Sequence, residues 1–494
     1  MRTVSRREFL KLSAAGAAGA LALPKWSSAA EPPAGAKPNI VHIILDDWGY
    51  YESSFMGNPR LVTPNIDRIA KEGMRLPQMS AGGPVCGPSR CTLLTGLHTG
   101  HCSVRDNPGG TPIRADEVTI GQVLKGAGYA TGGFGKWGIG DCGTTGVPEK
   151  HGFDVFFGYY HQVHAHSYYP NYLLRNSEKV PLPGNTGELQ KGQTYSQYLI
   201  VREALSFIRA NKDKPFYAYL PWTPPHGTFA IPETDPAWQK YKDQPAAKLQ
   251  EQTGLVAKAQ GRGSLVRLAM IEMADRQVGE VLALLKELGL EDRTLVMLSG
   301  DNGSVPEAHV RDAKTGKAFR GNKGALYEGG LRVFFAAMWP GKIKPGTVSE
   351  QVCYFPDVFA TIADFAGGRP PADIDGLSLV PTLLGEDKAG KKQQQHEFLY
   401  WEFGNQTAVR MGDWKAVRRG AGRPAKKQAE KQVEKPAAWE LYDLSQDIEE
   451  ANDVAKDHAD IVAKIDALAT AAHKPVQPGS RVDAEAGFKN HKAT

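Results

Sequence analysis

The sequence predicts an α/β protein with a large mixed central sheet that carries helices on both faces, followed by a smaller C-terminal α+β domain with an antiparallel sheet. From residue 39 onward, short apolar runs alternate with segments of helical periodicity, which is typical of a sheet covered by helices. Near Gly385 the pattern changes to short strands separated by turns. The chain of 494 residues is also longer than the roughly 250 to 300 residues that one core usually supports.

The expected central strands are apolar without strict alternation, as in strands that are buried on both faces. They are the runs 40–45, 129–134, 216–220, 295–298 and 333–338. The clearest helix is expected over 264–288, because Leu, Ile and Val recur there at spacings of three, four and seven residues. Gly289 follows as a stop signal.

A smaller domain is expected beyond the Lys- and Gln-rich residues 388–395, which are typical of a linker. Its predicted elements are a strand over 398–402, a hairpin over 409–417 around Gly412 and Asp413, a strand at 441–442 and a helix over 461–472. We therefore predict an N-terminal domain over 31–387 and a C-terminal domain over 396–494.

The first 30 residues are typical of an export signal. Arg6 and Arg7 form a twin-arginine pair ahead of the weakly apolar stretch 12–23, and residues 28–30 are small enough for cleavage. The alternative is a membrane anchor, but the stretch is shorter than the roughly 20 residues that a spanning helix needs. We expect export by the twin-arginine route to the periplasm or beyond, with no stable membrane anchor.

Removal of this segment leaves the chain nearly neutral. Residues 1–30 hold five Lys or Arg and one acid, so the net charge falls from +5 to +1. A near-neutral protein gives no bulk electrostatic reason to expect nucleic acid or a membrane surface as a partner. The basic run over 418–435 is expected to be a solvated loop.

Two acidic pairs predict a metal site. Asp46 and Asp47 directly follow the first apolar run, and Asp301 with Asn302 follows the fourth. Because ligands of α/β sheets bind beyond the carboxyl ends of the strands, both pairs should meet in one crevice. Oxygen donors without Cys or His suit a hard cation, Ca²⁺ first and Mg²⁺ second. The alternative is that each pair only caps a helix after its strand.

Cys86 is expected at the start of a helix. Pro88 and Ser89 are typical of a helix N-terminus, which places Cys86 in the positive field of the helix dipole and Arg90 one turn along. The alternative is an unreactive cysteine near a helix cap. The segment from Cys86 to Gly96, however, resembles the sulfatase signature C-x-P-S-R followed by T-G, which the formylglycine-generating machinery reads when it oxidises the cysteine.

The resemblance to the sulfatases, a family of the alkaline phosphatase superfamily, extends over nearly the whole chain after residue 30. Further family landmarks appear in order at Asp46-Asp47, Gly135-Lys136-Trp137, Pro225-His226, Asp301-Asn302-Gly303, Lys323 with Gly324 to Gly330, Asp375 to Leu379, and Glu440 to Leu444. Agreement of so many motifs in one order is specific to the family.

The resemblance implies an arylsulfatase-like sulfuric ester hydrolase whose catalytic domain is residues 31–387. It implies that Cys86 becomes formylglycine (3-oxoalanine), that one hydroxyl of its hydrate attacks sulfur, and that the other then expels sulfate. A Ca²⁺ ion would polarise the sulfate and the diol. Its implied ligands are Asp46, Asp47, residue 86, Asp301 and Asn302.

The resemblance also implies roles for the other site residues. Lys136 and Lys323 would bind sulfate oxygens, and Arg90 would orient residue 86. His226 would face the leaving ester oxygen, and Asp301 would also serve as a base. Without the resemblance, a Lys in a glycine-rich loop is usually solvated, and a lone His on a loop is seldom catalytic.

Gly138 departs from the family pattern, because many sulfatases have His two positions after this lysine. The segment 159–170 is dense in His and Tyr. We predict that His166 reaches into the site and partly fills the vacant place, with His164 as the second choice. The alternative is that these histidines lie on an exposed loop or line the substrate cleft.

The cysteines leave one question open. If Cys86 is modified, the remaining four either form disulfides after export or stay as buried thiols; these are Cys91, Cys102, Cys142 and Cys353.

Two other functions stay open from the sequence: a phosphonate monoester or phosphodiester hydrolase of the same superfamily, and a non-catalytic carbohydrate-binding relative. The expected substrate is a sulfated carbohydrate or an aryl sulfate. Transient partners would be the formylglycine-generating and twin-arginine export machineries. The expected recognition loops, 159–176 and 239–262, carry no motif that identifies the natural substrate.

Overall fold

The computed structural model describes residues 37–58, 61–245, 262–306, 311–312, 315–420 and 437–481. The predicted export signal, most of the basic run over 418–435 and most of the loop 239–262 lie outside the described residues. Within the described ranges, no helix is long and apolar enough to cross a membrane.

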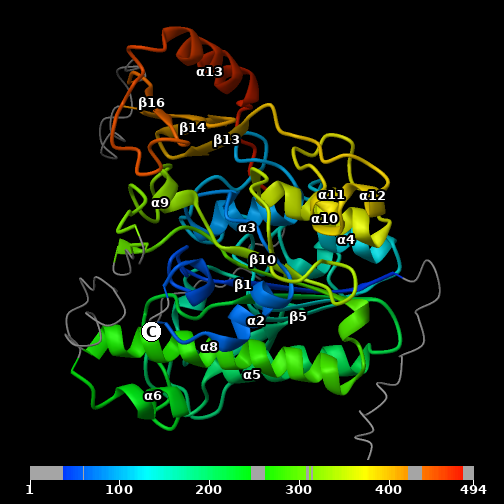
Figure 1. The fold of residues 1–494 in the computed structure, drawn as a ribbon. Helices are drawn as coiled ribbons and strands as arrows, with labels where there is room; N and C mark the ends of the chain where they lie inside the picture. Colours follow the sequence, from blue (N-terminus) through cyan, green and yellow to red (C-terminus); the bar gives the residue numbers. More distant parts are fainter. Residues whose placement is uncertain are drawn as a thin grey trace, which may run out of the picture. The chain divides into compact units, whose positions relative to one another are not determined.

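A ten-stranded mixed sheet lies at the centre of the fold (Figure 1). Its strand order is β11-β2-β10-β9-β1-β8-β4-β5-β6-β7, and the neighbouring strands from β9 to β5 are parallel. The strands are β1 (Asn39–Leu45), β2 (Met74–Arg75), β4 (Ala130–Lys136), β5 (Val155–Tyr159), β6 (Tyr172–Arg175), β7 (Glu178–Pro181), β8 (Phe216–Trp222), β9 (Thr294–Gly300), β10 (Phe335–Met338) and β11 (Thr347–Val348). The predicted α/β class and all five predicted central strands are confirmed.

One predicted strand begins later than expected. β10 starts at Phe335 instead of residue 333, because the backbone N–H of Val333 donates to the carbonyl of Met79 at 3.2 Å. Met79 belongs to a small separate sheet of β3 (Met79–Ser80) and β12 (Cys353–Tyr354). The chain therefore leaves one sheet just before it enters the other.

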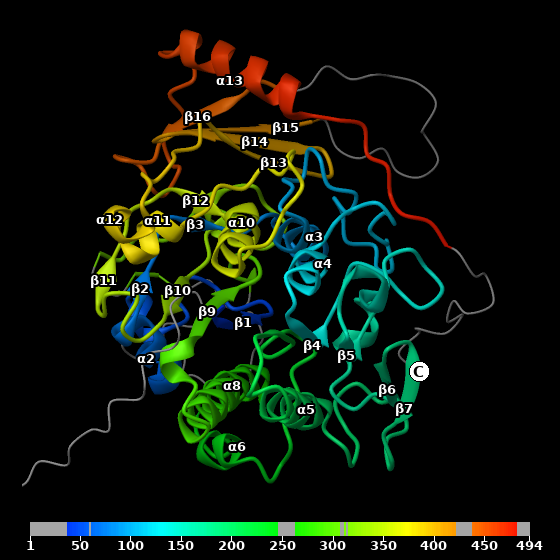
Figure 2. The ribbon, with the colours of Figure 1, turned by 90° about the vertical axis from the view of Figure 1, so that its right-hand side faces the viewer.

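Helices cover both faces of the central sheet, which Figure 2 shows between two helical layers. In β1, Ile40 and Ile44 pack into the core on one face, whereas Val41, Ile43 and Leu45 pack into the core on the other. The first layer contains α3 (Cys86–Thr95), α4 (Ile120–Gly126) and α10 (Phe355–Ala366), and the second contains α2 (Pro64–Glu72), α5 (Ser196–Ala210) and α8 (Arg262–Glu287). Burial on both faces explains why these strands are apolar without alternation.

The predicted long helix is confirmed as α8, and Gly289 after it adopts the left-handed conformation, with φ 64°. The shorter helices are η1 (Ser54–Met56), η2 (Pro148–His151), η3 (His164–His166), α6 (Pro236–Tyr241), η4 (Glu291–Arg293), α9 (Glu328–Leu331), α11 (Val380–Leu384) and α12 (Glu386–Ala389). The last of these overlaps the predicted linker, so residues 388 and 389 are helical instead of irregular.

The predicted C-terminal antiparallel sheet is also confirmed. It has four strands, β13 (Leu399–Phe403), β14 (Gln406–Met411), β15 (Trp414–Arg419) and β16 (Glu440–Asp443), and is followed by α13 (Ala459–Ala472). Gly412, with φ 61°, makes the predicted turn between β14 and β15. The exact domain boundaries stay a prediction.

The two faces of this second sheet have different neighbours. Val409 and Leu441 pack against Ile465 of α13, whereas Trp401 and Val417 belong to a core that includes Leu326, Tyr327 and Leu331 around α9. The Gln406 side chain also donates to the carbonyl of Gly324 at 2.9 Å. The C-terminal sheet therefore supports the loop that carries Lys323.

Candidate active site

The two predicted acidic pairs meet beyond the carboxyl ends of β1 and β9. These strands are parallel neighbours, with Leu45 opposite Gly300, so the residues after them leave the sheet side by side. The Asp47 backbone N–H donates to Asp301 Oδ1 at 3.1 Å, and Asn302 Nδ2 donates to Asp47 Oδ1 at 3.0 Å. Asp46 lies beside them, and all four side chains are buried.

Cys86 is the first residue of α3, after the extended residue Val85. Its thiol donates to Asp46 Oδ1 at 3.3 Å and accepts from Lys323 Nζ at 3.6 Å. Burial, and then the Asp46 carboxylate, raise the pKa of the Cys86 thiol to about 12. Because the thiolate is the reactive form, an unmodified Cys86 is a poor nucleophile despite its place at a helix N-terminus.

Three cations surround the acids; Lys136 and Arg90 are fully buried, and the Lys323 side chain is 19% exposed. Lys136, at the end of β4, lies 2.6 Å from Asp46 Oδ2, and Lys323 lies 2.6 Å from Asp47 Oδ1. Arg90 pairs with the carboxylates of Asp301 at 3.0 Å and Asp46 at 3.3 Å. When all three acids are ionised, their charges balance those of the three cations.

The cations also control the protonation of the acids. Burial opposes the charged form of Asp46, but Lys136 and then the other nearby cationic groups outweigh it and hold the pKa of Asp46 well below its usual range. For Asp301 the balance is the opposite, since burial and the neighbouring Asp46 raise its pKa to about 7. When three carboxyl groups lie together in one buried site, the pKa of at least one of them is raised.

His226 lies on the loop after β8, with Nε2 3.4 Å from Asp47 Oδ2. The hydroxyl of Tyr168 donates to its backbone carbonyl at 2.9 Å. Burial lowers the pKa of His226 to about 3, so its imidazole is neutral. The ring stacks on His166, with centroids 4.7 Å apart and an interplanar angle of 17°.

The structure thus brings His166 into the site, but it corrects the prediction that His166 fills the place at Gly138. That place is taken by Gln162, whose Nε2 would lie 2.7 Å from a Cβ on Gly138. The reason is register, because the Gly138 N–H donates to the carbonyl of Tyr160 and so brings the next residues of that segment alongside. His164 contacts the carbonyl of Tyr172 instead, at 3.0 Å.

Arg267 of α8 contacts the candidate site, although nothing in the sequence singled it out. Its guanidinium donates to the backbone carbonyls of Asp47 at 2.8 Å and Pro225 at 3.0 Å, and pairs with Glu52 at 2.6 Å. It therefore ties α8 to one acidic residue and to the His226 loop. Helical periodicity marks the apolar residues of α8 but not this buried charge, so no sequence signal identified it.

All five cysteines are buried, and none of them forms a disulfide in this structure.

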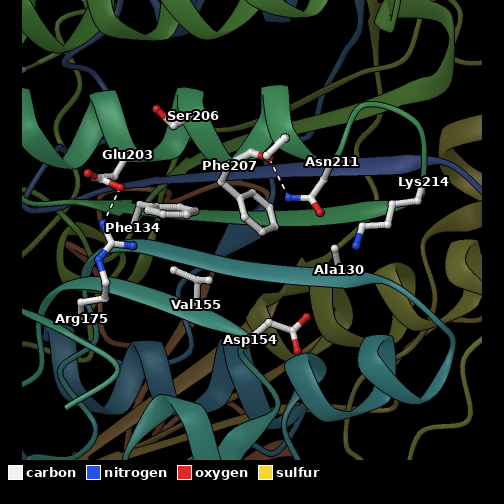
Figure 3. Close-up of a pocket in the computed structure, with 11 residues that line it drawn as sticks. Ala130, Phe134, Asp154, Val155, Arg175, Glu203, Ser206, Phe207, Asn211 and Lys214 are labelled. Carbon is white, nitrogen blue, oxygen red and sulfur yellow. Dashed lines mark hydrogen bonds and ion pairs between the residues drawn. The ribbon is translucent and has the colours of Figure 1, made fainter. Parts of the chain in front are cut away.

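A separate pocket lies between α5 and the strands β4 and β5 (Figure 3). Its lining combines apolar side chains such as Phe134 and Phe207 with the ion pair between Arg175 and Glu203, at 2.5 Å. Ala130, which begins β4, also lines it, whereas Lys136 ends that strand. None of the candidate site residues lines this pocket, so the catalytic groups lie elsewhere.

Comparison with known proteins agrees with this geometry. The model of the Sulfatase family matches residues 38–368, and the model of the C-terminal part of N-sulphoglucosamine sulphohydrolase matches residues 320–472. The N-acetylgalactosamine-6-sulfatase of Mus musculus is 33% identical over 409 residues, which cover 77% of this chain and 71% of that protein. Arylsulfatase A of Homo sapiens is 31% identical over 428 residues, covering 80% and 76%.

The fold has solved counterparts as well. The crystal structure of Ps i-CgsB in complex with k-i-k-neocarrahexaose matches with a TM-score of 0.70 and 23% identity, covering 88% of this chain and 93% of that chain. At this identity the likeness concerns the fold.

Proposed function

This chain belongs to the sulfatase family and hydrolyses sulfate esters, and from that premise we propose that it does so with a formylglycine made from Cys86 and one bound Ca²⁺. The observation that carries the proposal is the position of Cys86. It begins α3 inside the C-x-P-S-R segment, and its sulfur contacts both Asp46 and Lys323. A modified side chain at this position meets the acids and the cations together.

The residues around position 86 fit the modified group. A hydrated formylglycine supplies one hydroxyl that attacks sulfur and a second hydroxyl that loses its proton to expel sulfate and restore the aldehyde. Arg90 fixes the place of α3 against the sheet, since its guanidinium donates to the carbonyl of Lys136 at 2.7 Å and bridges Asp46 and Asp301. The Ser89 hydroxyl donates to the backbone carbonyl of Asp301 at 2.5 Å.

The donor set also fits a hard cation. Asp46, Asp47 and Asp301 offer carboxylate oxygens, and Asn302 Oδ1 is buried without a hydrogen-bond partner among the described residues. An unpartnered buried acceptor beside three carboxylates is what a Ca²⁺ ligand set requires. Bound Ca²⁺ supplies Lewis-acid polarisation of the sulfate group.

Charge balance indicates how the site binds sulfate. When ionised, the three acids balance the three cationic side chains, so a divalent ion makes the site positive and matched to an anionic ester. Lys323 Nζ contacts the sulfur of Cys86, and Lys136 pairs with Asp46, which also accepts from Cys86, so both lysines are assigned to the sulfate oxygens. His226 is assigned to the leaving ester oxygen, which takes up a proton as it departs. His166, stacked on the His226 ring, is assigned a share in this proton transfer.

The proposed substrate is a sulfated carbohydrate, with an aryl sulfate as the second choice. The names of the sugar and aryl sulfatases among the relatives support this class. A phosphonate monoester or phosphodiester substrate is not favoured. We further propose that the chain is modified by the formylglycine-generating machinery and exported by the twin-arginine route to the periplasm or beyond.

The test is the state of residue 86 in active enzyme. Protein from a host with formylglycine-generating machinery should contain an aldehyde at position 86 by mass spectrometry, and Cys86→Ser should lose turnover of an aryl sulfate with the fold retained. Cys91→Ser is the matched control, because Cys91 is a buried thiol on the same helix that belongs to the hydrophobic core. Full activity with an unmodified Cys86 thiol would refute the proposal.

A further inference from the structure

The side chain of Gln162 occupies the space in front of Gly138. A Cβ on Gly138 would lie 2.7 Å from Gln162 Nε2 and 3.1 Å from its Cδ, and 3.3 Å from Arg90 Cδ. On the other side, a Cβ on Gly87, the residue after Cys86, would lie 3.4 Å from the same Nε2. The carboxamide therefore lies between the end of β4 and the start of α3, next to the modified position.

One half of this carboxamide has no partner. Nε2 donates to the carbonyl of Gly138 at 3.2 Å, which orients the group. Oε1 is buried and has no hydrogen-bond partner among the described residues, and the side chain is 3% exposed. Oε1 is therefore free to accept a hydrogen bond from a group that binds in the site.

The chemistry of position 86 supplies such a donor. A hydrated aldehyde carries two hydroxyls, each with one proton to donate. The cations Lys136, Lys323 and Arg90 can only donate, and Asp46 already accepts from the residue 86 side chain. A second hydroxyl needs a further acceptor, and Gln162 offers one: its Nε2 borders Gly87, and Oε1 of the same carboxamide is buried and unpartnered among the described residues.

We propose that the Gln162 carboxamide oxygen accepts a hydrogen bond from one hydroxyl of the hydrated residue 86 and thereby stabilises the hydrate; this assignment rests on the proposed function. This arrangement requires glycine at position 138. Its φ of 82° lies in the left-handed region, and any side chain there would collide with the carboxamide. A neutral acceptor also leaves the charge balance of the site unchanged.

The test measures the balance between hydrate and free aldehyde. Gln162→Met keeps the length of the side chain and removes both polar ends. Capture of the free aldehyde by methoxyamine, which forms an oxime and releases water, is followed by mass spectrometry and normalised to the converted fraction of residue 86. Capture should become about two- to tenfold faster, as expected for one lost neutral hydrogen bond. The kcat should fall by a similar factor, with Ca²⁺ affinity within about twofold of wild type.

The matched control is Gln197→Met. Gln197 is equally buried, also has an unpartnered Oε1, and donates to Gln277 at 3.0 Å, away from position 86. It should lose stability without any change in capture rate. Gln162→Glu keeps an acceptor and should capture no faster than wild type, which provides the test if the Met variant does not fold.

The outcomes separate the two proposals. Wild-type protein without an aldehyde at position 86 would refute the proposed function and this assignment together. An aldehyde that is captured at the wild-type rate in Gln162→Met, or faster than wild type in Gln162→Glu, would overturn the role of Gln162 alone.

Discussion

Each charged side chain of the site has a partner of opposite sign. Asp46 pairs with Lys136, Asp47 with Lys323, and Asp301 with Arg90. Removing one member of such a pair leaves an uncompensated buried charge, which destabilises a protein by about 3 to 5 kcal/mol. Variants of these residues therefore report on stability as well as on catalysis, so binding must be measured beside turnover.

Metal removal tests whether the two acidic pairs bind Ca²⁺. Chelation should abolish turnover, and added Ca²⁺ should restore it to wild type but not to Asp301→Ala, which loses one carboxylate ligand. Asn302→Leu should weaken Ca²⁺ affinity at least about tenfold, because it removes the unpartnered Oδ1. Calorimetric titration gives the affinities. Stoichiometric zinc, with calcium absent, in fully active protein would contradict this assignment.

The stacked histidines give a second prediction. His166→Ala should lower kcat by about 10²- to 10⁴-fold, the range for a lost general acid or base. His164→Ala is the control and should be silent, because His164 contacts the Tyr172 carbonyl instead of the site. A change confined to KM would indicate that His166 contributes only uniform substrate binding.

At the scale of the element, α8 acts on the site through one side chain. Arg267 is 2% exposed and reaches the backbone of Asp47 and Pro225 together with Glu52. Asp47 needs this support, since a non-glycine residue with φ 57° is in an unfavourable conformation. α8 thus combines an apolar packing face with the fixation of two site segments.

Arg267→Lys should show this positioning role. Lysine keeps the charge but cannot make the divergent contacts of a guanidinium. We expect Ca²⁺ affinity and kcat to fall about tenfold each, with the circular dichroism spectrum retained. Arg276→Lys on the same helix is the control, because Arg276 pairs with Asp235 at 2.6 Å outside the site. Unchanged Ca²⁺ affinity in Arg267→Lys would mean that the residue only stabilises α8.

At the scale of the whole molecule, a buried ion network joins the C-terminal sheet to the segment after the Lys323 loop. Lys415 of β15 lies 2.8 Å from Glu328 of α9 and 3.0 Å from Glu450. Burial raises the pKa of Glu328, but Arg332 and Lys415 outweigh it and hold that pKa below its usual value. Burial and the nearby Glu328 raise the pKa of Glu450 to about 7. The two carboxyl groups share too little positive charge for both to ionise easily.

This network makes stability depend on pH. Glu450 binds a proton more tightly in the folded state than in the unfolded state, so its contribution is complete below the unfolded pKa of about 4.3 and is lost as pH rises toward about 7. Glu450→Gln resembles the protonated form. Its free energy of unfolding relative to wild type should therefore increase between pH 5 and pH 7.5 by an amount on the order of 1 kcal/mol.

Urea unfolding of both proteins at the two pH values gives this difference. Glu449→Gln is the control, because the neighbouring carboxylate of Glu449 is only half-buried and accepts from the Ala318 backbone N–H at 3.0 Å, outside the ion network. A difference that stays constant with pH, or that decreases, would show that Glu450 is ionised in the folded protein.

The sequence by itself determined the α/β class, the central strands, the convergence of the two acidic pairs and the helix that begins at Cys86. Each of these depends on local signals: apolar runs, cap residues, and the rule that parallel strands end at one edge. The motif order also sufficed to assign the family.

Only the tertiary structure decided which distant side chains complete the site. Gln162 stands at Gly138 because the segments after β4 and β5 stay in register, and Arg267 reaches Asp47 because α8 packs beneath the sheet. Neither contact leaves a periodic trace in the chain. The physical reason is that periodicity reports which face of an element is buried, whereas the residues that it meets on that face depend on the order of the strands in the sheet.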